Sequence, residues 1–317
     1  MQLPSLRQLQ YLASLYEHQH FGRAADACHV SQSTLSAGLK ELETVLDMRL
    51  VERSRRVVVF TPLGVSVVRR AQDLLLRARD LCLVGVSPLA GALRISIIPT
   101  IAPFLLPRIL PAIRAAHPEL EFQVHEEMSH EGCAGLSRGA RDCMILALPY
   151  ECGEFEVATL FEDPILVAAR ADDPLMQAPV VDPSDLPDER LLFLQEGHCL
   201  RDHALKVCRR ADQRSGSAPG ASIYTLVQLV DAGLGVTMLP QIAVDSGIMS
   251  GTQVITRPLA GGETGRVVSL AWRRNSPRAE GFALLAMTIR DICARQGIAS
   301  GAYPPAEAVI GSVDQSS

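Results

Sequence analysis

The sequence contains no apolar run that approaches the roughly 18 residues needed to cross a membrane. Its first residues, MQLPSLRQLQYL, lack the basic and then apolar order of a secretory signal. We therefore expect a cytoplasmic protein with no membrane partner. Because thiols stay reduced in that compartment, the eight cysteines are expected to be free, metal-binding or redox-active rather than a structural disulfide framework.

The motifs of several common enzyme classes are also missing. The chain has neither the GxxxxGK[ST] loop that cradles phosphates nor the GxGxxG of dinucleotide-binding folds. It also lacks the GxSxG of serine hydrolases and the HExxH of zinc proteases. We expect no cofactor and no bound metal, and we do not expect an enzyme.

Charge is distributed unevenly along the 317 residues, a length sufficient for two domains. Residues 1–90 hold 11 Lys and Arg against 8 Asp and Glu, whereas the remainder holds 19 against 27. A mildly basic head on an acidic body is the balance expected when the head binds a polyanion and the body does not.

The first 61 residues show the pattern of a winged helix-turn-helix. Apolar residues three and four apart predict a helix in LRQLQYLASLYEHQ, and FGRAADACHV predicts a short helix with small residues. A third helix begins after Ser31 or Ser33 as N-cap and has leucines along one side. Short polar groups on its other side, and a basic wing after it, predict DNA contacts. The candidates are Gln32, Ser33, Thr34, Ser36, Lys40, Arg53, Arg55 and Arg56. A small helical bundle with a solvated third helix is the alternative.

A long helical pattern follows and leads to a second domain. From Pro62 to about Gly85 apolar residues recur at three and four, which predicts a dimerisation helix with Cys82 packed on its seam. VSPLAG ends this helix. The predicted domains are a DNA-binding domain (1–61), a linker helix (62–87), an effector domain (88–298) and a tail (299–317) whose composition is typical of disorder.

The effector domain alternates predicted strands and helices, which indicates an α/β fold with a parallel sheet. ALRISIIPT, IAPFLLPRILPAIRAAHP and LEFQVHEE form a βαβ unit. Further strands are predicted in DCMILAL, PILVAAR and LLFLQ. Ligands of such folds bind beyond the carboxyl ends of strands, where Thr100 and Ser129 lie.

From about residue 6 to residue 296 the chain resembles LysR-type transcriptional regulators. FGRAADACHVSQSTLSAGLKELE followed by LVERSRRVVVFTPLG is similar to their N-terminal winged helix. The body resembles their two-lobed effector domain, which has a periplasmic-binding-protein fold. SIIPTIAPFLLP and GLGVTMLP belong to the common scaffold, whereas GHCLRD with a second cysteine nine residues on resembles the peroxide-sensing members.

The resemblance implies a homodimeric or homotetrameric activator that binds double-stranded DNA, responds to hydrogen peroxide and works with RNA polymerase on antioxidant genes. A cellular dithiol would reset it. It also implies that Cys199 is the peroxidatic and Cys208 the resolving cysteine. The pocket around the reacting thiol would contain Thr100, Ser129, His198, Arg201 and Arg266. Ser129 stands where these sensors usually carry threonine, so the hydroxyl is retained.

Helix geometry in EGHCLRDHALKVC places the two thiols differently. If the helix begins near His198, Cys199 lies in its first turn, where the helix dipole and Arg201 favour the thiolate. The buried face would comprise Leu200, Ala204, Val207, Cys208 and Ala211. Nine helical residues rise about 13.5 Å and turn about 900°, so the thiols face nearly opposite sides. Since a disulfide needs Cα atoms within about 7 Å, the helix must unwind before the two can join.

Three other interpretations remain open. His198, Cys199, His203 and Cys208 are all metal-ligand types, but an intact helix cannot close a tetrahedral site with Cys208 pointing away. A LysR-type regulator that responds to a small organic effector would leave both cysteines structural. A thiol peroxidase would share the site, yet would not need the basic head.

The other cysteines are weaker candidates. Cys28, Cys143 and Cys293 are expected in the core. Cys133 and Cys152 are expected in less regular segments, where oxidation would be incidental.

Overall fold

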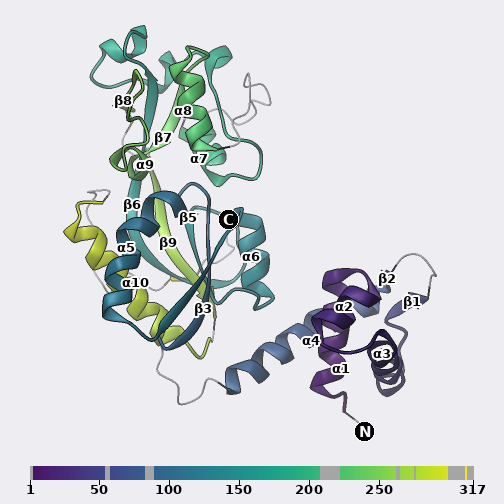
Figure 1. The fold of residues 1–317 in the computed structure, drawn as a ribbon. Helices are drawn as coiled ribbons and strands as arrows, with labels where there is room; N and C mark the ends of the chain where they lie inside the picture. Colours follow the sequence, from purple (N-terminus) through teal and green to yellow (C-terminus); the bar gives the residue numbers. More distant parts are fainter. Residues whose placement is uncertain are drawn as a thin grey trace. The chain divides into compact units, whose positions relative to one another are not determined.

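The computed structural model describes residues 3–53, 58–82, 89–207, 222–261, 265–274, 276–298 and 311–312. The chain divides into two compact units, Met1–Val86 and Ser87–Ser317, each described here by itself (Figure 1). Among the described residues, no helix has the length and apolar character of a membrane span.

The first unit begins with three helices, α1 (Leu6–His18), α2 (Phe21–Ala27) and α3 (Gln32–Leu46). An antiparallel pair, β1 (Val51–Arg53) and β2 (Val58–Phe60), and the long helix α4 (Pro62–Leu81) follow. Of the two serines predicted to start the third helix, Ser31 is the N-cap, and its hydroxyl accepts a hydrogen bond from the Thr34 amide. The predicted helix-turn-helix with a following hairpin is therefore present.

Close packing of the first three helices depends on small residues. A Cβ atom at Gly38 of α3 would lie 2.7 Å from Cδ2 of Tyr11 on α1, closer than real side chains approach. Of the small residues predicted on this short helix, Ala24 and Ala25 of α2 are buried, whereas Ala27 is exposed. On α4, Val68 and Ala71 are buried in this unit. Cys82 is exposed, so its predicted packing has no counterpart within the single chain.

The second unit contains a mixed sheet with helices around it. The elements of its first part are β3 (Gly91–Ile97), α5 (Ala102–Ala116), β4 (Leu120–Glu126), α6 (Ser129–Ser137), β5 (Cys143–Leu148) and β6 (Phe155–Arg170). Three 3-10 turns follow at Pro174–Gln177, Pro183–Asp185 and Asp188–Arg190. The later elements are α7 (Cys199–Val207), α8 (Ile223–Asp231), β7 (Thr237–Pro240), α9 (Gln241–Asp245), β8 (Val254–Pro258), β9 (Gly265–Arg273), α10 (Ala279–Arg295) and β10 (Gly311–Ser312).

One long strand, β6, belongs to both lobes of this unit. Its first part, Phe155–Pro164, pairs with β9 in a sheet of order β10-β6-β9-β5-β3-β4. Its last part, Ile165–Arg170, pairs with β7 and β8. Figure 1 shows α5, α6 and α10 around the first lobe and α7, α8 and α9 with the second.

The sheet differs from the predicted parallel one. β3 pairs in parallel with β4 and β5, but β9 runs antiparallel between β5 and β6. A parallel neighbour needs a crossover, and β9 instead returns from the second lobe in the opposite direction. The predicted strand PILVAAR is the end of β6, and LLFLQ forms no strand because only isolated bridges, such as Leu191 to Val236, hold it.

Candidate functional site

Two hydroxyl side chains lie where the parallel strands of the first lobe end. Thr100 follows β3, and Ser129 is the first residue of α6 after β4. Both are 2% exposed. The structure thus brings both residues to the carboxyl edge of the sheet, as the sequence predicted, and buries them there.

A buried ion pair holds Thr100 to the two strands that connect the lobes. Arg266 of β9 donates to the Thr100 hydroxyl at 2.8 Å and to its carbonyl oxygen at 3.1 Å. The same guanidinium donates through Nε and Nη2 to Oδ2 of Asp163 on β6, at 3.0 and 2.9 Å. Oδ1 of Asp163 accepts from the amide of Ile242 on α9 at 2.9 Å. Burial raises the pKa of the Asp163 carboxyl, and Arg266 and this amide oppose that effect.

Cys199 is the first residue of α7, and its side chain is 2% exposed. Burial raises the pKa of its thiol, while the positive charge of Arg266 and a hydrogen bond with Ser129 act in the opposite direction. Asp202 adds to the increase. The backbone amide at the start of α7 also acts to lower this pKa, as predicted, but the net shift is upward because removal from water outweighs the groups that favour the thiolate.

Arg201 does not supply the positive charge predicted for the thiol. Its Nη1 donates to the carbonyl oxygen of Leu194 at 3.1 Å, and its guanidinium carbon lies 5.7 Å from the ring centre of Phe193. Residues two apart on a helix point about 200° away from each other, so Arg201 faces away from Cys199. Arg266, distant in sequence, is the arginine that acts on the thiol.

Two buried histidines flank the thiol along the chain. His198 is 5% exposed, and neither of its ring nitrogens has a hydrogen-bond partner in the described parts of the chain. His203 lies one turn along α7, and its Nε2 is 3.0 Å from the carbonyl oxygen of Pro149. Burial lowers the pKa of both imidazoles, which favours their neutral forms.

Asp163 and Tyr150 belong to this site but were not predicted from the sequence. Burial raises the pKa of the Tyr150 phenol, and Cys199 and Asp202 add to the increase. Tyr150 directly follows Pro149, whose carbonyl oxygen is 3.0 Å from Nε2 of His203 on α7. Asp163 could have been suspected, because a carboxylate inside the apolar run of FEDPILV must find a partner when buried. No comparable signal marks Tyr150.

The resolving cysteine proposed from the resemblance lies outside the described residues. The helix is continuous from Cys199 to Val207, with Leu200 and Ala204 buried as predicted. Cys208 and Ala211 are not described, so the expected Cys199–Cys208 pairing remains a prediction. Among the described residues, no group of three His, Cys, Asp or Glu side chains is arranged to hold a metal ion.

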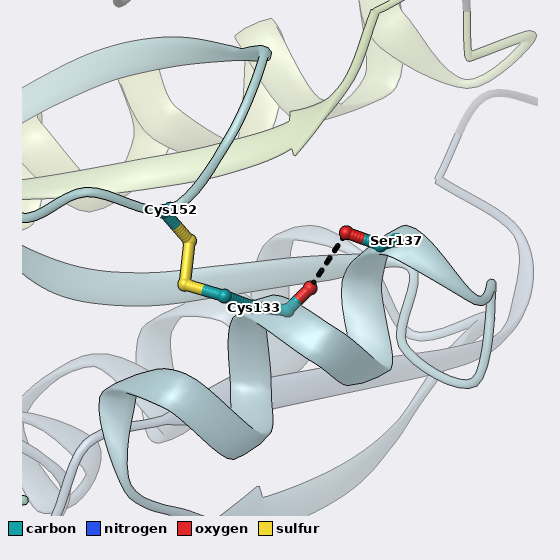
Figure 2. The surroundings of a disulfide bond; sticks show 3 residues. All are labelled: Cys133, Ser137 and Cys152. Atoms are coloured by element: carbon teal, nitrogen blue, oxygen red, sulfur yellow. Dashed lines mark hydrogen bonds between the residues drawn. A yellow bond between two sulfur atoms is a disulfide. The ribbon is translucent and has the colours of Figure 1, made fainter.

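A disulfide joins Cys133 and Cys152, with their Cα atoms 5.4 Å apart. Figure 2 shows Cys133 on α6 and Cys152 in the segment that passes beside it. The prediction that both lie in irregular segments is wrong for Cys133, and both are paired rather than free. Their proximity depends on the packing of α6 beside the end of β5, which spacing along the chain does not reveal.

The remaining described cysteines are free. Cys143 and Cys293 are buried as predicted, and burial raises the pKa of both thiols, to about 12 for Cys293. Cys28 is partly buried against the core of the first unit. These environments disfavour the thiolate of Cys143 and Cys293.

The predicted DNA-contacting face of α3 is open to solvent. Gln32, Ser36 and Lys40 are exposed. Ser33 and Thr34 are exposed as well, but their hydroxyls lie 2.9 and 2.8 Å from Oγ of the N-cap Ser31. The side chain of Arg53 and the whole of Arg55 and Arg56 lie outside the described residues.

Comparison with known proteins covers almost the whole chain. Residues 6–65 match the family "Bacterial regulatory helix-turn-helix protein, lysR family", and residues 87–294 match "LysR substrate binding domain". The DNA-binding transcriptional dual regulator OxyR of Escherichia coli K12 is 39% identical over 290 residues, which span 90% of this chain and 95% of the relative. The HTH-type transcriptional regulator EstR of Acinetobacter baylyi is 38% identical over 297 residues, covering 92% and 98%.

Solved structures give the same assignment. Full-length OxyR of Pseudomonas aeruginosa, with a cysteine replaced by aspartate, matches with a TM-score of 0.76 at 35% identity, over 92% of this chain and 96% of that one. A hydrogen-peroxide-bound cysteine mutant of Corynebacterium glutamicum OxyR matches with a TM-score of 0.62 at 32% identity, over 94% and 96%. The chain belongs to the LysR family of bacterial helix-turn-helix transcription regulators.

Proposed function

We propose that this regulator senses hydrogen peroxide by oxidation of Cys199 and responds by activating antioxidant genes. The observation that carries the proposal is the buried Cys199 thiol at the start of α7, whose pKa both the Ser129 hydroxyl and the Arg266 charge act to lower. The similarity to OxyR proteins, including one with bound hydrogen peroxide, supports it. Family membership and the exposed α3 face support DNA as the partner of the first unit.

Oxidation of the thiol by peroxide needs hydrogen-bond donors for the oxygen that leaves as hydroxide. Sulfur attacks one peroxide oxygen, the O–O bond breaks, and the other oxygen leaves as hydroxide, which takes up a proton to form water. Arg266 and the hydroxyls of Thr100 and Ser129 are the donors available for the developing negative charge. The buried thiol must lose its proton as it reacts, and the neutral imidazole of His198 is available to accept it.

The sulfenic acid on Cys199 would then condense with the Cys208 thiol, releasing water and leaving a disulfide. Because α7 is helical from Cys199 to Val207, this step requires the helix to unwind. We propose that unwinding re-packs the second lobe and changes the spacing of winged helices in a homodimer or homotetramer on DNA. RNA polymerase would respond to the changed spacing, and a cellular dithiol would reverse the switch by reducing the disulfide.

Each predicted domain except the tail has its own role in the proposed function. Residues 1–61 bind DNA, 62–87 pair subunits, 88–298 sense peroxide, and 299–317 have no assigned role. On α3, Gln32, Ser33 and Ser36 would contact base edges while Lys40 contacts phosphate. Arg53, Arg55 and Arg56 would add phosphate contacts from the wing.

The first test is peptide mapping under non-reducing conditions after about one equivalent of peroxide for seconds. Trypsin places Cys199 in residues 191–201 and Cys208 in residues 207–209, so a disulfide between them joins two defined peptides. That product supports the switch. Cys199 stopping at a sulfenic acid would keep the sensor but remove the unwinding step. An unreactive Cys199 would refute peroxide sensing.

A DNA-binding assay provides the matching control. Cys199→Ser should bind operator DNA as the wild type does but lose its response to peroxide. Loss of DNA binding in this variant would instead make Cys199 a structural residue.

A small organic effector is the second candidate. It is favoured by EstR, whose identity to this chain is within one per cent of that of Escherichia coli OxyR and whose name does not mention peroxide. Under this function, peroxide would leave Cys199 unchanged and Cys199→Ser would keep the regulator's response.

A further inference from the structure

The disulfide between Cys133 and Cys152 joins two segments that both contact the surroundings of Cys199. On α6, Cys133 lies one helical turn after Ser129, so the two side chains share the buried face of that helix. The Ser129 hydroxyl in turn acts to lower the pKa of the Cys199 thiol. One end of the disulfide is therefore a single helical turn away from a residue that acts on the thiol.

The other end of the disulfide lies close to α7. Cys152 comes three residues after Pro149, whose carbonyl oxygen is 3.0 Å from Nε2 of His203 on α7. Between them lies Tyr150, the phenol that is affected by the charges of Cys199 and Asp202. Pro149 thus contacts α7 at its second turn, and the disulfide fastens the segment that follows Pro149 to α6.

The two cysteine residues differ in exposure to solvent. Cys133 is 7% exposed, within the core of the second unit. Cys152 is partly exposed and stands between exposed Glu151 and Gly153. An external thiol can therefore approach Sγ of Cys152 more readily than that of Cys133, which is the access that a reversible disulfide requires.

We propose that Cys133 and Cys152 are a second redox couple, whose disulfide holds Ser129 and residues 149–152 in the positions that make Cys199 reactive. The effect on peroxide sensitivity rests on the proposed function, whereas the redox couple and its restraint of α7 do not. With the disulfide closed the sensor is in its responsive state; with it open, α6 and residues 149–152 move independently and Cys199 reacts more slowly.

The couple forms and opens by balanced steps. Two thiols and one hydrogen peroxide give the disulfide and two water molecules, the thiols losing two electrons and two protons. For opening, a thiolate of a cellular dithiol attacks Sγ of Cys152 and expels Cys133 as a thiolate, which takes up a proton. The second thiol of the reductant then attacks the mixed disulfide and releases Cys152.

The first experiment establishes the couple in the full chain. Protein equilibrated with oxidised or reduced dithiothreitol is alkylated and digested with trypsin. The disulfide joins peptide 115–138 to peptide 142–170, and cleavage after Glu151 separates Cys152 from Cys143. We expect this linked pair after oxidation and its loss after reduction. If Cys133 and Cys152 remain free thiols after oxidation, the proposal is overturned.

The second experiment measures, without peroxide, how strongly the disulfide restrains α7. Amide hydrogen exchange over residues 199–207 is compared between wild-type protein with the Cys133–Cys152 disulfide closed and the same protein after reduction, both with Cys199 shown to be a free thiol. We expect exchange in α7 to accelerate about three- to tenfold on opening, the effect of weakening one or two hydrogen bonds. Equal exchange rates in the two states would show that the disulfide does not affect α7, which would overturn this part of the proposal.

The third experiment measures the reactivity of Cys199. The rate of its loss to peroxide is compared in wild-type protein and in Cys133→Ser/Cys152→Ser, with Cys28→Ser/Cys82→Ser as a control that also removes two thiols. We expect a three- to tenfold slower rate only in Cys133→Ser/Cys152→Ser, the effect of weakening one or two hydrogen bonds around Cys199. Equal rates in all three proteins would overturn the effect on sensing. If wild-type Cys199 itself does not react, the proposed peroxide sensing is wrong. The exchange experiment then still tests whether the disulfide restrains α7.

Discussion

At the scale of single residues, the Cys199 site combines burial with positive charge, and burial is the stronger effect on the thiol. Its pKa is raised although Arg266 and Ser129 act to lower it. A protonated thiol reacts slowly with most electrophiles. Selectivity for peroxide would then come from donors placed for its departing oxygen, not from a permanently ionised sulfur.

This balance predicts how the reaction depends on pH. Below the raised pKa of Cys199 the thiolate fraction grows with pH, so its oxidation rate should rise by about tenfold per unit between pH 6 and pH 8 if the thiolate is the nucleophile. Stopped reactions followed by alkylation and mass spectrometry measure this profile. A rate independent of pH over that range would show that the proton is transferred within the site.

Ser129 should contribute through its hydroxyl, which acts to lower the pKa of the Cys199 thiol. Ser129→Ala removes an interaction that lowers the pKa of Cys199, so oxidation at pH 7 should slow by about fivefold, the effect of one hydrogen bond. Ser246→Ala, which removes a hydroxyl bonded to Ile242 on α9, is the matched control and should leave the rate unchanged. Equal rates in both variants would mean that the Ser129 hydroxyl has no role in reactivity.

The Asp163–Arg266 pair should matter for stability as well as for the site. Asp163→Ala leaves the guanidinium of Arg266 buried without its counter-charge, which costs about 3–5 kcal/mol of unfolding free energy. Asp172→Ala removes an exposed partner of Arg170 and should change stability little. Urea unfolding of both variants tests this difference, and similar midpoints would argue against a structural role for the buried pair.

At the scale of elements, the disulfide should stabilise the second unit. Because the two cysteines are 19 residues apart, the loop they close corresponds to a stabilisation of about 3 kcal/mol. Reduction should lower the urea midpoint of the wild type by a matching amount and leave that of Cys133→Ser/Cys152→Ser unchanged. A midpoint insensitive to reduction in both proteins would contradict this.

The sequence predicted local features more completely than contacts between distant segments. Leucine spacing and Ser31 specify α3 through interactions within a few residues, and the structure bears them out. The position of Cys199 at the start of a helix was predicted for the same reason. By contrast, Arg266 pairs with Asp163 across 103 residues, and no local pattern identifies that partner. Arg201 was misplaced because nearness along a helix does not give the direction of a side chain.

At the scale of the whole molecule, α4 carries the prediction of oligomeric state. Leu74 and Leu81 are exposed in the single chain, although the sequence places them beside the apolar seam of a dimerisation helix. Leu74→Glu should shift the assembly towards monomers and weaken DNA binding, whereas Met48→Glu, another exposed apolar position of the first unit, should not. Sedimentation velocity distinguishes the two, and an unchanged assembly in Leu74→Glu would place the subunit contact elsewhere.

The continuity of β6 restricts which changes of length the second unit can tolerate. Side chains of a strand alternate between faces, so one residue inserted after Asp163 would turn every later side chain of β6 to the opposite face. The buried side chains of the part that pairs with β7 and β8, Ile165 and Val167 among them, would turn to the opposite face, while the residues before the insertion would keep their orientation. Insertions and deletions among homologues should therefore avoid this strand and collect in the connections around it, even where individual β6 residues vary.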